Sequence, residues 1–249
     1  MKGQDESSNA ADFHAQLDDV FGRIADRYDL LCDLFSLGIH RIWKQRVAAI
    51  IAQEPWSCLL DAAAGTGDVV LRVAHQQVLQ REQTVITSDI SPPMLAIARK
   101  RAGALASLLD FRILDAHCMP GIESGSIDLY SISLGLKICD RSRVIQEAMR
   151  VLRPGGRFIS LEASNMVYPW LQRAYLRYMS LCMPVIGWIA TGGDASAYKY
   201  LLKGIQEFPG AEALAAELTS AGFEEVSFER LSLGIVAIHM ARKPLSMQS

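Results

Sequence analysis

Two kinds of apolar spacing alternate along the chain. Short apolar runs bounded by turn-forming residues, which are typical of buried strands, are separated by segments in which apolar residues recur every three or four positions, as on amphipathic helices. This alternation predicts an α/β protein with a Rossmann-like, seven-stranded and mostly parallel sheet. The predicted strands are Cys58–Asp61, Thr84–Ser88, Asp110–Leu114, Ile127–Ser133, Arg157–Glu162, Glu225–Leu231 and Gly234–Ala241.

Helix signals fill the segments between these strands. Pro92 and Pro93 suit a first helical turn, where a missing N–H costs nothing. Arg153-Pro154-Gly155-Gly156 is predicted to be a turn that ends a helix and starts the fifth strand. The predicted helices begin at Asp68 and cover Pro92–Ala104, Arg141–Leu152 and Ala211–Ala221, the last with Gly222 as its C-cap.

Two further helices are predicted before the first strand, within residues 12–53. One begins near Asp12, a plausible N-cap, and runs towards Tyr28, and the other covers about Ile39 to Ala52. Because both precede the sheet, we expect them to fold as a lid over the carboxyl ends of the strands, where ligands bind in open α/β sheets. Packing within this lid is the simpler explanation for His40 and Trp43.

A long insertion, about residues 163–210, separates the fifth strand from the last two. Its pattern is helical and amphipathic, and we expect it to build a pocket with an apolar, aromatic lining for the molecule that accepts a chemical group, the acceptor. Helix packing explains any single one of its large residues better, but together they favour a hydrophobic acceptor. These residues are Tyr168, Trp170, Tyr175, Tyr178, Met179, Met183, Trp188, Tyr198 and Tyr200.

Composition favours one domain over residues 1–249, with a polar, disordered tail at residues 1–11. Half of the residues are hydrophobic, which is ample for a core, and no repeat or low-complexity run marks a second unit. A net charge of −2 provides no electrostatic footprint for nucleic acid.

Cysteine usage and the lack of a targeting segment predict a cytoplasmic protein. The five cysteines are scattered and never spaced as Cys-x-x-Cys, so we expect free thiols in a reducing compartment and no metal site. The N-terminus has no signal-peptide core. The most apolar segment, Leu181 to Ala190, is too short to span a bilayer and is interrupted by Pro184 and Gly187.

Candidate chemistry concentrates where the first strand ends, at Asp61-Ala62-Ala63-Ala64-Gly65-Thr66-Gly67-Asp68. Gly65 and Gly67 lack a Cβ, so the backbone can approach a ligand closely and present N–H groups at a helix N-terminus. Asp89 follows the second strand about 20 residues later, the spacing at which a carboxylate reaches the ribose hydroxyls of a nucleoside. An ordinary strand-to-helix turn explains an isolated Gly-x-Gly about equally well.

Two residues of this segment restrict the ligand. Val70 stands where the third glycine of the dinucleotide fingerprint would fall, which disfavours a pyrophosphate cofactor and a Rossmann oxidoreductase. Asp61 would repel a phosphate but could assist an ammonium group. Together they favour a nucleoside with a small charged tail.

These motifs, with Leu152-Arg153-Pro154-Gly155-Gly156, resemble class I methyltransferases that use S-adenosylmethionine. Most of the chain, about Val20 to Lys243, is similar to the UbiE/COQ5 family, the C-methyltransferases of menaquinone and ubiquinone synthesis. The specific matches are Arg27-Tyr28-Asp29, Gly38-Ile39-His40-Arg41-Ile42-Trp43-Lys44, the glycine loop, Ser133-Leu134-Gly135-Leu136 and Gly234-Ile235-Val236-Ala237-Ile238-His239.

The resemblance implies S-adenosyl-L-methionine as cofactor, S-adenosyl-L-homocysteine as its product, and a set of cofactor-binding residues. Asp115, which follows the third strand, could accept a hydrogen bond from the adenine amino group, although the family often has Asn there; a loop acid is the alternative. The full set is Asp61, Gly65, Thr66, Gly67, Asp89, Ile90, Asp115, Ala116 and Ser133.

Methylation of a ring carbon also requires a deprotonated hydroxyl and loss of the ring proton, so a general base is expected. The family's loop after strand four usually reads Gly-Leu-Arg-Asn, whereas here it reads Gly135-Leu136-Lys137-Ile138. Lysine keeps the charge but loses the planar fork, and Ile138 cannot hydrogen-bond. The candidates for proton transfer or hydroxyl binding are, in falling order, Lys137, Tyr198, Tyr28 and His239; packing or solvent exposure explains each at least as well.

Two more segments depart from the family pattern: Thr191-Gly192-Gly193-Asp194, where Ala-Asn-Asp is usual, and Leu161-Glu162-Ala163-Ser164, where Phe precedes the glutamate and Ser-Lys-Pro follows it. Cofactor-facing residues are thus retained while acceptor-facing ones differ. The predicted function is methyl transfer to a ring carbon of a hydrophobic phenolic or quinol-like acceptor, such as a menaquinone or ubiquinone precursor.

Three alternatives stay open: C-methylation of an aromatic secondary metabolite, O-methylation, and a cofactor-binding protein of this fold that transfers no methyl group. Among partners we expect the small aromatic acceptor and no nucleic acid. A lipid-bearing acceptor would require peripheral contact with the inner face of the membrane, and the apolar insertion offers a surface for a homodimer.

Overall fold

The computed structural model describes residues 28–76, 82–191, 202 and 204–245. Within these residues the strands form one seven-stranded sheet in the order β3-β2-β1-β4-β5-β7-β6. The strands are β1 (Cys58–Ala62), β2 (Thr84–Asp89), β3 (Leu109–Ile113), β4 (Ile127–Ser133), β5 (Leu152–Ala163), β6 (Glu224–Leu231) and β7 (Val236–Arg242).

The sheet confirms the predicted fold class. Strands β1 to β5 pair in parallel, and β7 lies antiparallel between β5 and β6. Most strand boundaries differ from the predicted ones by one or two residues, and the largest difference is at β5, which begins at Leu152, directly after α6 (Arg141–Val151), rather than at Arg157. Ile127 pairs with Leu152 and Leu129 with Arg157, so the Arg153–Gly156 segment is a bulge within β5 instead of a turn before it.

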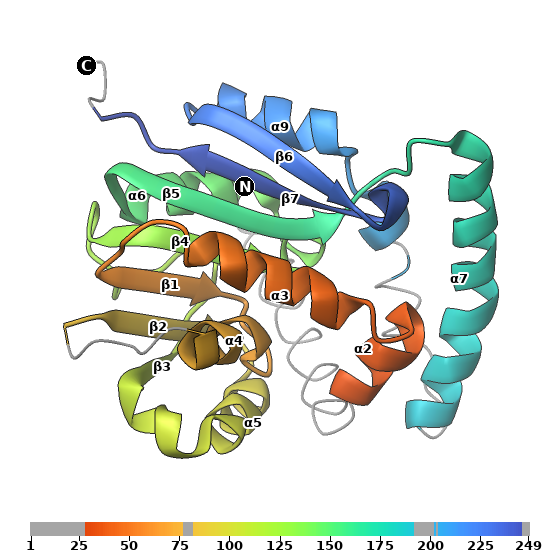
Figure 1. The fold of residues 1–249 in the computed structure, drawn as a ribbon, viewed down its shortest axis with the longest axis horizontal. Helices are drawn as coiled ribbons and strands as arrows, with labels where there is room; N and C mark the ends of the chain where they lie inside the picture. Colours follow the sequence, from red (N-terminus) through yellow and green to blue (C-terminus); the bar gives the residue numbers. More distant parts are fainter. Residues whose placement is uncertain (1–27, 77–81, 192–201, 203, 246–249) are drawn as a thin grey trace, which may run out of the picture.

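Helices cover both faces of the sheet, as Figure 1 shows. On one face α3 (His40–Ile51) packs against α4 (Asp68–Gln76), and their apolar side chains join those of Leu59 and Ile238 in one core cluster. On the other face α6 and α9 (Ala211–Ser220) enclose a second cluster around Tyr130 and Phe158. Helix α5 (Pro92–Ala102) packs against β2 and β3 and continues into η2 (Gly103–Leu108).

Helix α3 is part of the core, which corrects its prediction as a lid. Its buried residues Trp43, Val47 and Ile51 form a stripe at helical spacing, and this stripe packs on the sheet face. The indole N–H of Trp43 donates to Ser232 Oγ at 2.8 Å, which fastens the helix to the loop before β7. The N-terminal end of α3 lies towards the carboxyl ends of the parallel strands (Figure 1).

Helix α2 (Tyr28–Ser36) was not predicted. The sequence pattern placed a helix from Asp12 that ended near Tyr28, and residues 12–27 lie outside the described residues. After α2, Leu37 and Gly38 both have positive φ (51° and 77°), which breaks the helix before α3 begins. Helix α2 lies beyond the carboxyl ends of the parallel strands, beside α7 (Pro169–Thr191), in the position expected of a lid (Figure 1).

The insertion forms the 23-residue helix α7. Met179 is buried, and burial raises the pKa of Tyr175 to about 12, so these two side chains face the protein. Tyr168, Trp170 and Tyr178 are exposed, which contradicts the expectation that they line a pocket. Tyr198 and Tyr200 lie outside the described residues. Among the helices that the structure describes, none is both long and apolar enough to cross a membrane.

Candidate active site

The glycine loop joins β1 to α4 at the carboxyl end of the sheet. Ala63, Gly65 and Gly67 all adopt positive φ (48°, 56° and 79°), so the loop turns sharply three times within five residues. The loop is held to β2, because the Ala64 N–H donates to the Ser88 carbonyl at 2.9 Å. A Cβ added at Gly65 would meet no atom of the described residues within 4 Å, whereas one at Gly67 would lie 3.0 Å from Ala98 Cβ on α5. Gly65 therefore borders open space, and Gly67 is needed for packing.

Asp61, at the end of β1, is a buried carboxylate with one unused oxygen. The Ser131 hydroxyl on β4 donates to its Oδ1, while Oδ2 has no hydrogen-bond partner among the described residues. Burial raises the pKa of Asp61 to about 7, even though the Ser131 hydrogen bond and the Lys44 charge favour the ionised form. A buried, unpartnered carboxylate oxygen is unfavourable unless a donor or cation reaches it.

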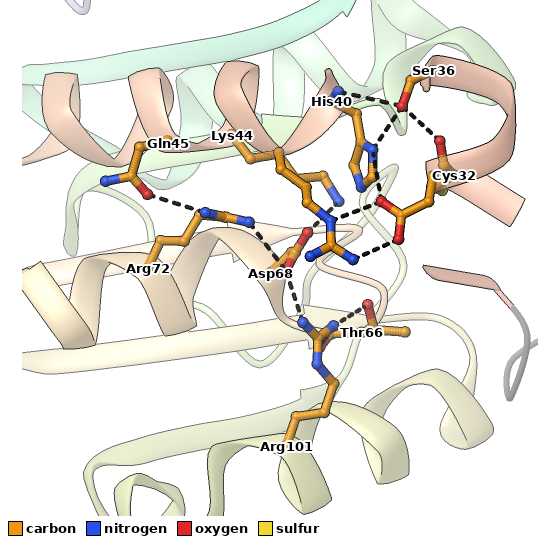
Figure 2. Close-up of polar contacts among 11 residues, drawn as sticks. Cys32, Ser36, His40, Lys44, Gln45, Thr66, Asp68, Arg72 and Arg101 are labelled. Carbon is orange, nitrogen blue, oxygen red and sulfur yellow. Dashed lines mark hydrogen bonds and ion pairs between the residues drawn. The ribbon is translucent and has the colours of Figure 1, made fainter. Parts of the chain in front are cut away.

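Asp68, the first residue of α4, is the centre of a charge network that Figure 2 shows. Lys44 Nζ of α3 lies 3.1 Å from its Oδ2, and Arg101 of α5 donates to its Oδ1 at 2.8 Å. Burial alone would raise the pKa of Asp68, but these two cations hold it well below its ordinary value. Arg101 also donates to the hydroxyl of Thr66 at 2.8 Å, so the Thr66 side chain contributes to this network.

Two other residues of α3, His40 and Arg41, make polar contacts with α2. His40 Nδ1 lies 2.8 Å from Ser36 Oγ, and Arg41 donates to both carboxylate oxygens of Asp33. His40 is buried, and this burial lowers its pKa. Polar contacts therefore connect α2, α3, the glycine loop and α5 (Figure 2).

Asp89 lies beside the glycine loop at the end of β2. Its Oδ2 accepts the Gly65 N–H at 2.8 Å and its Oδ1 accepts the Ser91 N–H at 2.9 Å. Each carboxylate oxygen has capacity for a second hydrogen bond, so these contacts orient the carboxylate without preventing it from binding ribose hydroxyls. Ile90 follows at the same edge of the sheet and is partly exposed.

Asp115 and Ala116 follow β3. Asp115 Oδ1 accepts the His117 N–H at 2.9 Å and lies 2.6 Å from His117 Nδ1, and its backbone bridges to Cys118. The Ala116 side chain belongs to the core cluster under β4, which leaves its backbone as the group able to contact a ligand. The turn therefore holds the Asp115 carboxylate at the edge where adenine recognition was predicted.

The loop after β4 lies against the glycine loop. Leu134 has a φ of 60° and Gly135 follows it, and a Cβ at Gly135 would lie only 2.7 Å from Ala63 Cβ. The hydroxyl of Ser133 is buried and has no hydrogen-bond partner within the described part of the chain. Ser133 and Asp61 thus each present an unused polar atom on neighbouring strands.

Lys137, in the loop after β4, makes its polar contacts with that loop and with the end of β5. Its ammonium is buried, donates to the Leu134 carbonyl and lies 3.8 Å from Glu162 Oε2. Glu162 is fully buried at the end of β5, and its Oε1 accepts the Leu136 N–H. Lys137 thus compensates the charge of a buried carboxylate, and its role in orienting an acceptor hydroxyl stays a prediction.

The other three candidates for proton transfer separate in the structure. His239 is buried on β7, and its Nε2–H donates to the Ala211 carbonyl of α9 at 2.8 Å. This bond links α9 to the sheet, and the catalytic role of His239 stays a prediction. Tyr28 is the first residue of α2, near the carboxyl ends of the strands, and Tyr198 lies outside the described residues.

Lys44, Ser131 and Glu162 take part in the site although none was a candidate. Lys44 was detectable from its spacing, since it lies on the apolar side of α3 with His40, Val47 and Ile51. Glu162 was detectable as an acid at the end of an otherwise apolar strand. The role of Ser131 depends on its register opposite Asp61, which no local pattern gives.

The assembled site can hold a nucleoside with a cationic tail at one edge of the sheet. Asp89 and Asp115 lie at this edge with carboxylates that neighbouring N–H groups orient, and Asp61 and Ser133 present unused polar atoms. Among the described residues there is no cluster of His, Cys, Asp and Glu able to hold a metal ion.

The sequence matches the model of the ubiE/COQ5 methyltransferase family over residues 9–243. It is 40% identical over 224 residues to the ubiquinone/menaquinone biosynthesis C-methyltransferase UbiE of Acidiphilium cryptum, covering 89% of this chain and 88% of that protein. It is 38% identical over 248 residues to the UbiE of Brucella anthropi, covering 98% of this chain and 91% of that protein.

Solved structures share the fold at low sequence identity. A SAM-dependent methyltransferase from Thermotoga maritima, described as a possible histamine N-methyltransferase, superposes with a TM-score of 0.64 at 19% identity and covers 91% of this chain and 99% of that one. The cyclase SpnF superposes with a TM-score of 0.60 at 22% identity and covers 81% of this chain and 82% of its own. The predicted class I methyltransferase fold is therefore confirmed.

Proposed function

Because the chain belongs to the ubiE/COQ5 methyltransferase family, we propose that it methylates a ring carbon of a hydrophobic, quinol-like acceptor, using S-adenosylmethionine. The first acceptors to consider are menaquinone and ubiquinone precursors, since the relatives at 38–40% identity are described as acting in that biosynthesis. The observation that carries the cofactor proposal is the unpartnered Oδ2 of buried Asp61 beside the glycine loop.

The residues around the glycine loop fit this cofactor. Asp61 offers its unused oxygen to the ammonium of the methionyl tail, and the space beside Gly65 admits a close backbone contact. Asp89 accepts hydrogen bonds from the ribose hydroxyls while the Gly65 and Ser91 N–H groups hold it in place. Asp115 accepts the adenine amino group, and Ser133 donates from the end of β4.

The chemical task of the protein is mainly positioning. S-adenosylmethionine supplies a methyl group already activated as a sulfonium, so the fold must align it with a nucleophilic ring carbon. The acceptor must also lose a hydroxyl proton and a ring proton. The predicted proton-transfer residues are Lys137, Tyr198, Tyr28 and His239, of which Lys137 contacts Glu162 and His239 contacts the Ala211 carbonyl.

A non-methylating function stays as the second candidate for one specific reason. The loop after β4 carries Lys137 and Ile138 where the family usually has Arg and Asn, and the Lys137 ammonium lies 3.8 Å from the buried Glu162 carboxylate. The structural likeness to the cyclase SpnF concerns the fold alone, so it does not distinguish the two functions.

The test is transfer of a labelled methyl group. Purified protein is incubated with methyl-labelled S-adenosylmethionine and either reduced demethylmenaquinol or a lipid extract of the host, and mass spectrometry locates the label. Label on a ring carbon of the quinol supports the proposal, and label on another extract component identifies a different acceptor. Absence of label with both acceptors, while calorimetry shows bound cofactor, contradicts methyl transfer.

A further inference from the structure

Helix α7 exposes an apolar stripe along its outer side. Trp170, Tyr178, Leu181 and Val185 are between 42% and 66% exposed. At about 100° per residue they fall within an arc of about 80° on the helix surface. Met179, which is buried, points in the opposite direction and marks the side that faces the protein. The stripe is therefore turned away from the core by the helix geometry itself.

The charges of α7 all have one sign. Arg173 and Arg177 are exposed, and the same helical geometry places both along one border of the stripe. Residues 169–191 contain no Asp or Glu, so the helix carries two positive charges and no negative one. Exposed Trp, Tyr and Leu beside arginines, without acids, is the composition of helices that lie in the interface of an anionic membrane.

The position of α7 connects this stripe to the acceptor side of the protein. The helix contacts α2 beyond the carboxyl ends of the parallel strands (Figure 1). Leu30 and Leu34 on α2 are also exposed. At the other end, the exposed Val167 donates its N–H to the carbonyl of Leu233, which is exposed as well. Exposed apolar residues thus occur at several points around this edge, which is uncommon for surfaces that only face water.

We propose that the outer side of α7 docks the protein on an anionic lipid surface. Trp170, Tyr178, Leu181 and Val185 enter the boundary between headgroups and acyl chains, and Arg173 and Arg177 contact anionic headgroups. Helix α7 is not apolar enough to span a bilayer, so it lies along the surface. Docking itself is inferred from the surface of α7. The proposal rests on the proposed function only for what docking would achieve, which is to bring the site to an acceptor with a lipid tail.

The experiment is cosedimentation with vesicles of phosphatidylcholine alone or mixed equally with phosphatidylglycerol. Wild-type protein should bind the mixed vesicles, and binding should fall as salt rises. Arg173→Glu/Arg177→Glu should lower the partition coefficient at least about 30-fold, since each basic residue near such a surface contributes about 1 kcal/mol. Leu181→Ser/Val185→Ser should lower it at least about tenfold.

Matched controls carry the same changes at exposed positions elsewhere. Leu108→Ser on η2, and Lys100→Glu/Arg143→Glu on α5 and α6, should leave vesicle binding unchanged. Circular dichroism checks that every variant is folded. Absence of vesicle binding, or equal binding by test and control variants, overturns the proposal. A third outcome also overturns the proposal: light scattering shows that the wild-type protein is a dimer, the α7 variants are monomers, and the wild-type protein does not bind vesicles. The outer side of α7 would then contact a second copy of the chain.

The docking test is separable from the proposed reaction. Vesicle binding is measured without an acceptor, so it can succeed even if methyl transfer fails. Conversely, methyl transfer to a quinol without a lipid tail should be unchanged in the α7 variants, because the changed side chains face away from the core. Equal loss of activity towards tailed and tail-less acceptors would show that α7 acts inside the site and would overturn the proposal.

Discussion

The ammonium of Lys137 lies 3.8 Å from Oε2 of Glu162, and the two side chains meet beneath the loop that follows β4. Glu162 also accepts the Leu136 N–H, and Lys137 donates to the Leu134 carbonyl, so the pair fixes the backbone of this loop at two points. The same loop places Gly135 against Ala63 of the glycine loop. An ion pair in the core thereby determines how the loops after β4 and β1 fit together.

We predict strong energetic coupling between Lys137 and Glu162. Lys137→Met leaves a buried carboxyl without its cation, and Glu162→Gln leaves a buried ammonium without its anion, so each should lower the free energy of unfolding by at least about 1 kcal/mol. The double variant should lose less than the sum, with a coupling of about 1 kcal/mol or more. Urea unfolding of the four proteins measures this.

The pair Arg46–Glu229 is the matched control for that cycle. Its ionised groups lie 2.9 Å apart, which is closer than Lys137 and Glu162, but the side chains are 44% and 35% exposed to solvent. Arg46→Met and Glu229→Gln should therefore show a coupling well below about 1 kcal/mol. If the losses of unfolding free energy in Lys137→Met and Glu162→Gln simply add in the double variant, Lys137 does not compensate the buried acid. Orientation of an acceptor hydroxyl would then be the better explanation for Lys137.

Gly65→Ala should weaken cofactor binding more than it lowers stability, whereas Gly67→Ala should mainly lower stability. Both positions have positive φ, which disfavours alanine by roughly 1–2 kcal/mol. At Gly67 the new methyl also meets Ala98 Cβ at 3.0 Å, so unfolding should become easier by more than at Gly65. At Gly65 the methyl enters open space beside the loop, so cofactor affinity should fall at least about tenfold while stability changes less.

Gly125→Ala separates backbone strain from loss of the ligand contact. Gly125 has a φ of 71° and open space around its Cβ position, but it lies in the turn before β4, outside the candidate site. The Gly125→Ala variant should lose about as much stability as Gly65→Ala. Its affinity for S-adenosylhomocysteine, measured by calorimetry, should equal that of the wild type. An unchanged affinity in Gly65→Ala would argue against cofactor contact at this loop.

Removing Asp68 should destabilise the protein more than removing Lys44. Asp68→Asn leaves the buried Lys44 ammonium without the only ion-pair partner recorded for it among the described residues, a change that costs about 3 kcal/mol or more. Lys44→Met leaves Asp68 still paired with Arg101 at 2.8 Å, so its effect should be smaller. Thermal unfolding at neutral pH compares them, and a larger effect of Lys44→Met would show that the lysine has another role.

Much of the fold could be predicted because its signals are local. The strand that ends at Ser133 and the helix that starts at Pro92 were predicted from apolar runs and from turn chemistry next to them, and the structure confirms both positions. The bulge at Arg153–Gly156 was not predictable, since it depends on the register with β4. Helix α3 was mistaken for a lid because its amphipathic pattern gives a buried face but does not say what that face contacts.

The part of the site formed by strand ends and the loops that directly follow them could be predicted from the sequence. Asp61, Gly65 and Asp89 lie together as their spacing indicated, because parallel strands end at the same edge of a sheet. The directions of Lys137 and His239 could not be predicted, since they depend on Glu162 and on Ala211, distant residues that supply a charge and a carbonyl. The direction of a buried polar side chain is set by its hydrogen-bond or ion-pair partner, and that partner is identified only in the folded structure.

Asp61→Asn should stabilise the ligand-free protein at alkaline pH. Burial raises the pKa of Asp61 to about 7, above its value near 4 in an unfolded chain. The folded state therefore holds a proton that the unfolded state loses, and the stability from this group is present below about pH 4 and is lost as pH rises to about 7. At pH 8 the variant should melt at least about 2 °C above wild type, and at pH 4 the difference should vanish. A lower melting point at pH 8 would contradict the unpaired buried charge.

Cofactor binding should show the opposite dependence on the same carboxyl group. A cationic tail beside Asp61 favours the ionised carboxylate and lowers its pKa, so binding below about pH 7 must release the proton that the free protein holds. Affinity for S-adenosylhomocysteine should therefore rise with pH, by up to about tenfold per pH unit, and level off above about pH 7. Calorimetry in two buffers of different ionisation enthalpy counts the released proton.

Asp61→Asn and Ser133→Ala complete this test. The ligand's own amino group titrates identically with every protein, so the difference between wild type and Asp61→Asn isolates the carboxyl group. Asp61→Asn should bind weakly with a flattened pH profile and no extra proton release, whereas Ser133→Ala should weaken binding and keep the wild-type profile, because its hydroxyl does not titrate in this range. If Asp61→Asn retains the wild-type profile, the unpartnered Oδ2 of Asp61 does not face the cofactor's charge, and the ammonium must be bound elsewhere along the edge of the sheet.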